Sequence, residues 1–205
     1  MLTRIDHVVI GVPELERGVQ AYRRLGFNVG AEGFALNDDD YLQLAAAPKE
    51  GVQSIALRSD AAAEKLDLHG LPIVIAGARR AGSPTPHPNG ALRIERVYVA
   101  VADVAAAAKA YSAALRLPAP KMERGTVIMA DMAVFQLGPT GLTLAQPCGP
   151  GVAADALARR GPGPFQVLLR TSGMDAASRW MAEQGLPPPA RGIRNTGEHA
   201  MLVPP

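Results

Sequence analysis

The chain contains an internal repeat, and this repeat restricts its possible folds more than any other feature of the sequence. Residues 94–101 (IERVYVAV) match residues 5–12 (IDHVVIGV) at an offset of 89 residues, the difference between positions 94 and 5. The register continues downstream, where Tyr111 takes the place of Tyr22. Both copies are rich in β-branched residues and are followed by apolar residues at helical spacing. We therefore expect a strand and then a helix in each copy.

A second pair of segments also repeats. Residues 54–59 (SIALRS) match residues 166–171 (QVLLRT), and each segment has the composition of a strand. We expect a helix after each of them, one ending at His69-Gly70 and the other at Gln184-Gly185, because glycine commonly ends helices. The four segments thus predict four strand–helix modules in the order A, B, A, B.

This order of modules predicts the fold class and the domain organisation. A small module has one apolar face that it cannot bury alone, so it must pair with another module. We predict an α+β fold in which four βαβββ modules, some of them shortened, pair into curved sheets around a cleft. The expected units are residues 1–91 and 92–205, joined by a Pro- and Gly-rich linker at residues 80–90. Further short strands are expected at residues 27–29, 34–36, 41–44, 126–129, 133–137 and 142–145.

Composition and charge exclude several classes of function. The net charge is +2, acidic and basic residues are interspersed, and aromatic residues make up only 4% of the chain. The sequence therefore offers neither a basic patch nor a stacking platform for nucleic acid. No apolar run reaches the roughly 18 residues that a membrane span needs. Phosphate-binding loops, dinucleotide fingerprints and nucleophile elbows are also missing from the sequence.

The single cysteine, Cys148, limits the chemistry further. One cysteine can form neither an internal disulfide nor a cysteine-based zinc site. It lies in the turn-rich segment 146–150 (QPCGP), with no helix start behind it to activate a thiol, so we do not expect a nucleophile there. The lack of disulfides and of a secretory leader predicts a cytoplasmic protein.

The opening segment resembles a known superfamily. Residues 5–10 (IDHVVI) precede a Pro13-Glu14-Leu15 helix start, and this combination resembles the glyoxalase/bleomycin-resistance/extradiol-dioxygenase (vicinal oxygen chelate) superfamily. Residues 87–91 (HPNGA) are similar to a glyoxalase-like branch of unknown function. The resemblance covers nearly the whole chain. It implies a cleft that holds a small organic ligand and a divalent metal such as Mn, Fe, Ni or Zn.

Two residues take the positions of metal ligands in this superfamily. His7 matches the ligand on the first strand, and Gln43 lies where a glutamate is expected. Strand alternation places Ile5 and His7 on one face, so we expect His7 to point inward. The alternative is a histidine that hydrogen-bonds locally, beside Asp6. Two neutral donors are fewer than the three or more ligands that such metals normally require.

Two further residues are candidate substrate contacts. Arg96 takes the place of His7 in the third module, and Tyr41 lies two residues before Gln43 on the same strand face. A guanidinium in a cleft can clamp a carboxylate with two hydrogen bonds. The alternative for Arg96 is an exposed ion pair with Glu95. The corresponding positions in the later modules are Thr143 and Val167, which are poor metal ligands.

The sequence leaves more than one function open. The first hypothesis is a metal-dependent lyase, isomerase or dioxygenase that binds a small organic molecule in the cleft. The second is a binding protein that sequesters a small molecule without chemistry, and the third is a structural dimer with a filled cleft. A homodimer is expected because shortened modules leave sheet edges that need cover. The carboxylates of Glu32, Glu123 and Asp131 are unassigned, and any of them near His7 would favour the first hypothesis.

Overall fold

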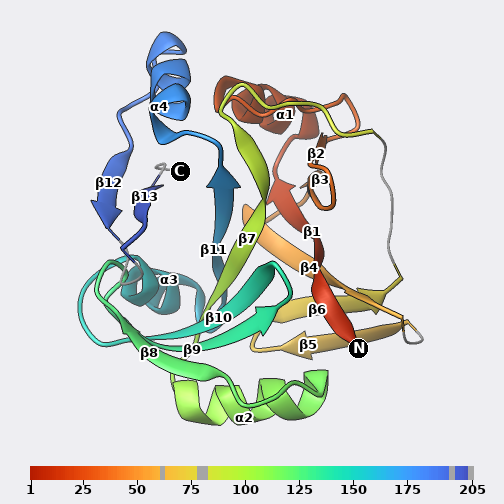
Figure 1. The fold of residues 1–205 in the computed structure, drawn as a ribbon, viewed down its shortest axis with the longest axis vertical. Helices are drawn as coiled ribbons and strands as arrows, with labels where there is room; N and C mark the ends of the chain where they lie inside the picture. Colours follow the sequence, from red (N-terminus) through yellow and green to blue (C-terminus); the bar gives the residue numbers. More distant parts are fainter. Residues whose placement is uncertain (61–62, 78–82, 194–196, 203–205) are drawn as a thin grey trace.

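The computed structural model describes residues 1–60, 63–77, 83–193 and 197–202 of the 205-residue chain. Helices and strands follow one another along the chain as Figure 1 shows. Their bounds are β1 (Leu2–Val12), α1 (Leu15–Arg24), β2 (Phe34–Leu36), β3 (Tyr41–Ala46), β4 (Gly51–Ser59), β5 (Glu64–Leu68), β6 (Leu71–Ala76), β7 (Ala91–Ala100), α2 (Val104–Leu115), β8 (Lys121–Gly125), β9 (Ala130–Leu137), β10 (Thr140–Pro147), α3 (Val152–Arg160), β11 (Gly163–Thr171), α4 (Met174–Glu183), β12 (Ala190–Ile193) and β13 (His199–Leu202).

The strands form two mixed sheets and a hairpin. The first sheet has the order β2-β3-β1-β4-β6-β5, and the second has the order β11-β7-β10-β9-β8. In each sheet the repeated strand pairs in the same way, because β1 is parallel to β3 and antiparallel to β4, while β7 is parallel to β10 and antiparallel to β11. Strands β12 and β13 pair only with each other. The predicted α+β class with repeated βα modules is confirmed.

One continuous apolar core joins the two sheets. It contains Ile5 and Val8 of β1, Val97 and Val99 of β7, and the ring of Tyr111 on α2. Tyr111 is completely buried, and its hydroxyl donates a hydrogen bond of 2.7 Å to the backbone oxygen of Leu68. Burial raises the pKa of Tyr111 above its usual range. The face of each sheet that carries this core is called its core face below, and the opposite face is its cleft face.

The helices begin and end where charge and capping favour it. Glu16 lies in the first turn of α1, and Arg23 and Arg24 lie in the last turn, so the charges complement the helix dipole. The side chain of Asp103 caps α2 by accepting a hydrogen bond of 2.9 Å from the backbone of Ala106. Helix α3 contacts β7, β10 and β11, and its residue Ala153 packs on the cleft face of the second sheet.

Three elements differ from the sequence prediction. The strand expected at residues 27–29 is reduced to an isolated bridge between Val29 and Ala35. The helix expected before His69-Gly70 is absent from the described residues, and strand β5 occupies residues 64–68 instead. His69 and Gly70 both have positive φ, 52° and 69°, and they form the turn of a β5–β6 hairpin rather than the end of a helix. The strand expected at residues 126–129 is a turn between β8 and β9.

The division into units 1–91 and 92–205 stays a prediction. The first sheet lies within the earlier range, and the second lies within the later one except for Ala91, the first residue of β7, but the core is shared between them. Of the predicted linker, residues 80–82 lie outside the described part of the chain. None of the helices that the structure describes has the length and apolarity to cross a bilayer.

Candidate functional site

His7 is held by a carboxylate at a bulge in β1. The pairing of β1 with β4 slips between Ile5 and His7, where Asp6 forms a bulge. Ile5 therefore pairs with Leu57 and His7 with Ala56, which places His7 on the cleft face, opposite Ile5. The expectation that Ile5 and His7 share a face is wrong, because the bulge interrupts the alternation of the strand.

The Asp6 carboxylate binds both His7 and Arg58. One oxygen lies 3.0 Å from Nδ1 of His7, and the other accepts two hydrogen bonds of 2.9 and 2.8 Å from Arg58. Burial acts to raise the pKa of Asp6, but the hydrogen bonds and positive charges of His7 and Arg58 outweigh it, so the pKa is lowered. Asp6 thus stays ionised and holds the imidazole in one orientation.

Aromatic rings fill the space beside His7. The ring of Tyr41 stacks on the imidazole with 4.5 Å between centroids, and Phe34 packs against Tyr41 at 5.7 Å. Tyr41 lies directly opposite His7 in the β1–β3 pairing, and Gln43 lies opposite Val9, two residues further along the same face. The structure therefore brings His7 and Tyr41 together and places Gln43 one step away. Only 11% of the His7 side chain is exposed.

A second carboxylate links the first sheet to the second. Asp40 is buried, and its Oδ1 accepts hydrogen bonds from the backbone of Ile94 at 3.0 Å and from Asn37 at 2.6 Å. Its Oδ2 lies 3.1 Å from Arg4, which also pairs with Asp39 at 2.9 Å. Burial raises the pKa of Asp40, although these donors act against the shift.

The donor set around His7 does not fit a divalent metal. His7 offers one free ring nitrogen, Gln43 offers a neutral amide oxygen, and the carboxylate of Asp6 is occupied by His7 and Arg58. Among the residues that the structure describes, no group of three or more His, Cys, Asp and Glu side chains is placed to hold a metal ion. Metal binding by His7 and Gln43 therefore stays a prediction without a suitable third ligand.

Arg96 occupies the equivalent place in the second sheet but has different neighbours. Its Nη1 donates a long hydrogen bond of 3.4 Å to Thr143, and its buried Nε has no partner. It pairs with Gly141, the counterpart of Tyr41, so no ring covers it. Glu95 is bound to Arg170 at 2.8 Å, so the expected alternative of an ion pair between Glu95 and Arg96 is not what the structure shows.

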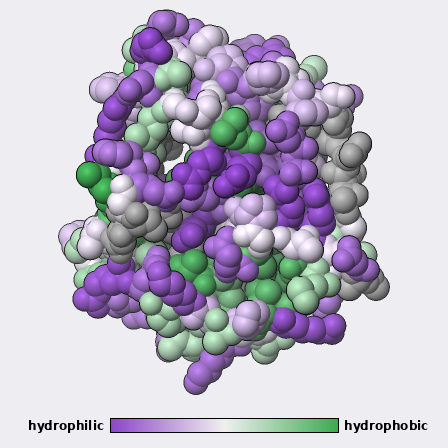
Figure 2. All heavy atoms as spheres, in the orientation of Figure 1, coloured by the Kyte–Doolittle hydropathy of each residue, from purple (hydrophilic) through white to green (hydrophobic). Residues whose placement is uncertain are grey.

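A cavity of about 260 Å³ lies on the cleft face of the second sheet. Its floor comes from β7, β8, β9 and β11, and the β12–β13 hairpin and the start of α3 complete its walls. Figure 2 shows that hydrophilic side chains gather over the middle of the face viewed in Figure 1, where β7 and β1 lie. The residues that line the cavity include Tyr98, Glu123, Met132, Gln166, Leu168, Arg191, Ala200 and Met201.

The polar groups of this cavity come from opposite edges of the sheet. Gln166 lies on the edge strand β11, and its amide oxygen is buried without a hydrogen-bond partner. Glu123 lies on the other edge strand, β8, and forms an ion pair of 3.1 Å with the exposed Lys121. Between them lie Met132 and the ring of Tyr98, which packs against Phe165 at 6.0 Å.

Sequence reasoning missed most of these residues. The fourth module was expected to offer Val167, but Val167 packs toward the core and its neighbour Gln166 faces the cavity. Of the three unassigned carboxylates, Glu123 lines the cavity, Asp131 pairs with Arg124 at 2.8 Å, and Glu32 is exposed. Neighbouring residues of a strand point to opposite faces, so the assignment of Val167 to the core would have placed Gln166 on the cleft face.

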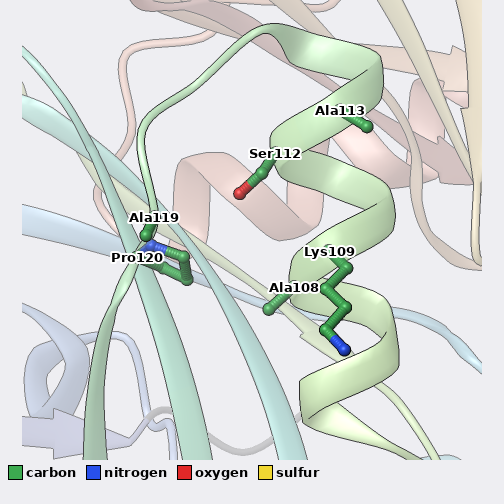
Figure 3. Close-up of a pocket in the computed structure, with 6 residues that line it drawn as sticks. All are labelled: Ala108, Lys109, Ser112, Ala113, Ala119 and Pro120. Carbon is green, nitrogen blue, oxygen red and sulfur yellow. The ribbon is translucent and has the colours of Figure 1, made fainter.

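A second hollow, of about 470 Å³, lies between α2 and the segment Ala119–Pro120. In Figure 3, Ser112 points from α2 toward Ala119 and Pro120. The wall is built from small side chains of Ala108, Ser112 and Ala113, with Lys109 as its one charged residue. This open hollow lacks the converging polar groups of a ligand site.

The remaining histidines and the cysteine lie outside the cavity. His87 is buried, accepts a hydrogen bond of 2.9 Å from the backbone of Asn28 at its Nδ1, and has its pKa lowered by burial. His69 stacks on Tyr111, with 5.6 Å between the ring centroids. His199 and Cys148 are exposed. None of the four lines the cavity.

Comparison with known proteins gives a fold but no close relative. No protein family model matches the chain, and no curated protein matches it significantly. Among solved structures, a triple mutant of 4-hydroxymandelate synthase from Streptomyces coelicolor is 15% identical, with a TM-score of 0.68 over 94% of this chain and 78% of that one. A fusion of a xylose isomerase-like TIM barrel with 4-hydroxyphenylpyruvate dioxygenase is 13% identical, with a TM-score of 0.62 over 91% of this chain and 39% of that one.

A third match covers only part of the chain. Methylmalonyl-CoA epimerase from Mycobacterium tuberculosis is 25% identical over 57% of this chain and 89% of that one, and its TM-score of 0.46 adds nothing to the fold assignment. The two longer matches are similar over nearly the whole chain. Together with the repeated modules and their strand pairing, they show that this chain has the fold of the vicinal oxygen chelate superfamily.

Proposed function

We propose that the protein binds a small organic molecule in the cavity of the second sheet and does not need a metal to do so. The observation that carries this proposal is the cavity itself, which is formed by the paired third and fourth modules and lined mainly by apolar side chains. Its volume of about 260 Å³ is close to the low end of ligand pockets. A ligand of the size of a single substituted ring fits such a space.

The residues of the cavity have distinct roles in this proposal. Met132 and Leu168 form apolar walls against the body of the ligand, and methionine adapts easily to different shapes. Tyr98 offers a ring face. The Arg96 guanidinium lies on the same strand face as Tyr98 but outside the cavity lining, so we propose it as a contact only for a longer ligand. Tyr41, whose ring stacks on His7 in the first sheet, lies outside this cavity, and its role as a substrate contact stays a prediction.

Methyl NMR tests the proposal directly. Ethylbenzene, a neutral probe, is titrated into protein labelled with ¹³C at the methionine methyl groups. We expect saturable shifts at Met132 and Met201, which line the cavity, and none at Met1 and Met181, which do not. Equal shifts at all methionines, or no saturation, would contradict binding in this cavity.

A matched pair of variants locates the binding site. Ala200→Phe places a ring in the cavity from β13, whereas Ala113→Phe adds the same ring to the exposed side of α2. We expect the first variant to lose the titration shifts and the second to keep them. Retained binding in Ala200→Phe, with both variants folded by circular dichroism, would place the ligand elsewhere.

The metal-dependent alternative has its own test. Elemental analysis of untagged protein loaded with Mn, Fe, Ni or Zn is expected to show no stoichiometric metal, because His7 and Gln43 supply only two neutral donors. Stoichiometric metal that disappears in His7→Ala would favour the metal-dependent lyase, isomerase or dioxygenase. Homodimerisation also stays a prediction, and analytical ultracentrifugation measures it.

A further inference from the structure

We infer that the ligand of this cavity is an apolar molecule with a hydrogen-bond-donating cationic head, such as a protonated amine, rather than an anion. This inference rests on the proposed function, since it names the chemical class that the same cavity selects. Three lining groups carry it: the Gln166 amide oxygen, the Glu123 carboxylate and the Tyr98 ring. Each of them interacts favourably with a cation that donates hydrogen bonds.

The Gln166 oxygen is the first part of the argument. This atom is buried and has no hydrogen-bond partner, and a buried acceptor without a partner costs free energy. The side chain projects from β11 beside Tyr98, its pairing partner on β7. A ligand that donates an N–H or O–H to this oxygen restores the missing bond, and a carboxylate has no proton to donate there.

The Glu123 carboxylate is the second part. It lies across the cavity floor from Gln166, and it forms an ion pair with Lys121 at 3.1 Å. The Lys121 side chain is 76% exposed, so this ion pair contributes little to stability and an incoming ammonium can replace it. An anion would meet the negative carboxylate without a compensating partner.

The charges around the cavity agree with this choice. Among the described residues of the lining, Arg191 is the one cationic side chain, and its Nη2 already donates to Asp175 at 3.0 Å and to Ser178 at 2.9 Å. The Tyr98 ring supplies a negative face that attracts cations. Arg96, which would attract an anion, is outside the lining. Two polar groups of the lining, the Gln166 amide oxygen and the Glu123 carboxylate, can therefore accept from a cationic donor.

A series of probes with one body and different heads tests the inference. Ethylbenzene, 2-phenylethanol, 2-phenylethylammonium and 3-phenylpropanoate are titrated at neutral pH, with the methyl shifts of Met132 and Met201 as the readout. We expect the ammonium probe to bind about tenfold more tightly than the carboxylate probe, with the alcohol between them. Equal affinities, or tighter binding of the carboxylate, would overturn the inference.

Variants assign the effect to single groups. Glu123→Gln is expected to remove most of the preference for ammonium over alcohol, while Asp131→Asn, which changes an exposed carboxylate outside the lining, leaves it intact. Gln166→Met is expected to weaken both donor probes and to leave ethylbenzene unaffected. A preference for ammonium that survives Glu123→Gln and Gln166→Met together would overturn the assignment to these residues.

The outcomes separate the two proposals. If ethylbenzene binds at Met132 and Met201 but the head groups make no difference, the binding function stands and the inference about the ligand fails. If no probe in the series binds, the proposed function itself fails. A carboxylate preference that disappears in Arg96→Gln would overturn the inference and assign the head of the ligand to Arg96.

Discussion

The two sheets carry equivalent residues on their cleft faces, but the surroundings of these residues differ. Both sheets have an acidic residue at the bulge of the repeated strand, and in both it pairs at 2.8 Å with an arginine from the next module, as Asp6 does with Arg58. Opposite the following residue, however, the first sheet has Tyr41 where the second has a glycine. A stacked ring covers His7, whereas the glycine opposite Arg96 has no side chain that could stack on it.

This difference shows how one module plan gives a closed face and an open one. The ion pair at the bulge is kept in both halves, so it belongs to the architecture. The side chain opposite the next residue differs: the ring of Tyr41 stacks on His7, whereas the Arg96 side chain itself lies over Gly141, with its Nε 3.4 Å from the place of a Cβ. The cavity of the second sheet lies beside Tyr98, two residues further along β7 than Arg96.

Removal of the covering ring is expected to have the largest effect. Tyr41→Ala deletes a buried ring that packs between His7 and Phe34, and we expect a loss of about 4 kcal/mol in the free energy of unfolding. Tyr98→Ala, at the edge of an existing cavity, should cost clearly less, because fewer packing contacts are lost. Urea denaturation of both variants measures the difference. Equal costs would contradict the distinction between the closed and the open face.

Two of the hydrogen bonds that join the halves, each at the first strand of a half, give the next largest effect. The backbone of Ile94 donates to Asp40 at 3.0 Å, and the backbone of Ile5 donates to Thr140 at 2.8 Å. We expect Asp40→Ala to cost about 3 kcal/mol, because it also leaves Arg4 and Asn37 without this carboxylate. Thr140→Val removes one acceptor and should cost about 1–2 kcal/mol.

Chemical denaturation of the single and double variants tests this order. The two sites act in different halves, so the two losses should add to within experimental error if each bond acts alone. A loss for Thr140→Val larger than that for Asp40→Ala would show that the charged link matters less than its geometry suggests.

The smallest expected effect is a difference in pH dependence. The pKa of Asp6 is lower in the folded protein than its ordinary value of 3.8. Its contribution to stability is therefore complete well above pH 3.8 and is lost as the pH falls through the lower, folded value. In Asp6→Asn this part of the acid sensitivity should disappear. The difference in free energy of unfolding between wild type and variant should therefore change by about 1 kcal/mol per pH unit between pH 3.8 and the lower, folded pKa of Asp6.

Thermal unfolding between neutral and acidic pH provides the measurement. Glu95→Gln is the matched variant in the second sheet, where Arg170 also binds Glu198 at 2.9 Å and so keeps a partner. Identical pH profiles for wild type and Asp6→Asn would show that Asp6 does not stabilise the fold through its charge.

The repeated strands were predictable from the sequence because their β-branched runs recur in register. The helix expected before His69-Gly70 was not found, since Lys65, Leu66 and Asp67 alternate as a strand and the glycine serves a hairpin turn. Propensity alone favoured the wrong element, because a glycine with positive φ is compatible with both a helix end and a tight turn.

The candidate site was less predictable than the fold. The bulge at Asp6 reverses the face of His7, and a bulge depends on pairing with β4 that the local sequence does not reveal. The cavity depends on the β12–β13 hairpin, which closes it from a position far along the chain from β7. Position-by-position transfer from a superfamily therefore identified His7 and Gln43 but not Gln166 or Glu123.

The reciprocal bonds at Ile5 and Ile94 also have a consequence for folding kinetics. They close loops of 135 and 54 residues, so the first strand of each half lacks a buried acceptor until the other half has formed. Long-range closure of this kind slows folding, because chain entropy is lost before the contacts that compensate for it are made. On the ribosome, β1 must wait for β10, and the N-terminal half completes its hydrogen bonding only when most of the chain has been synthesised.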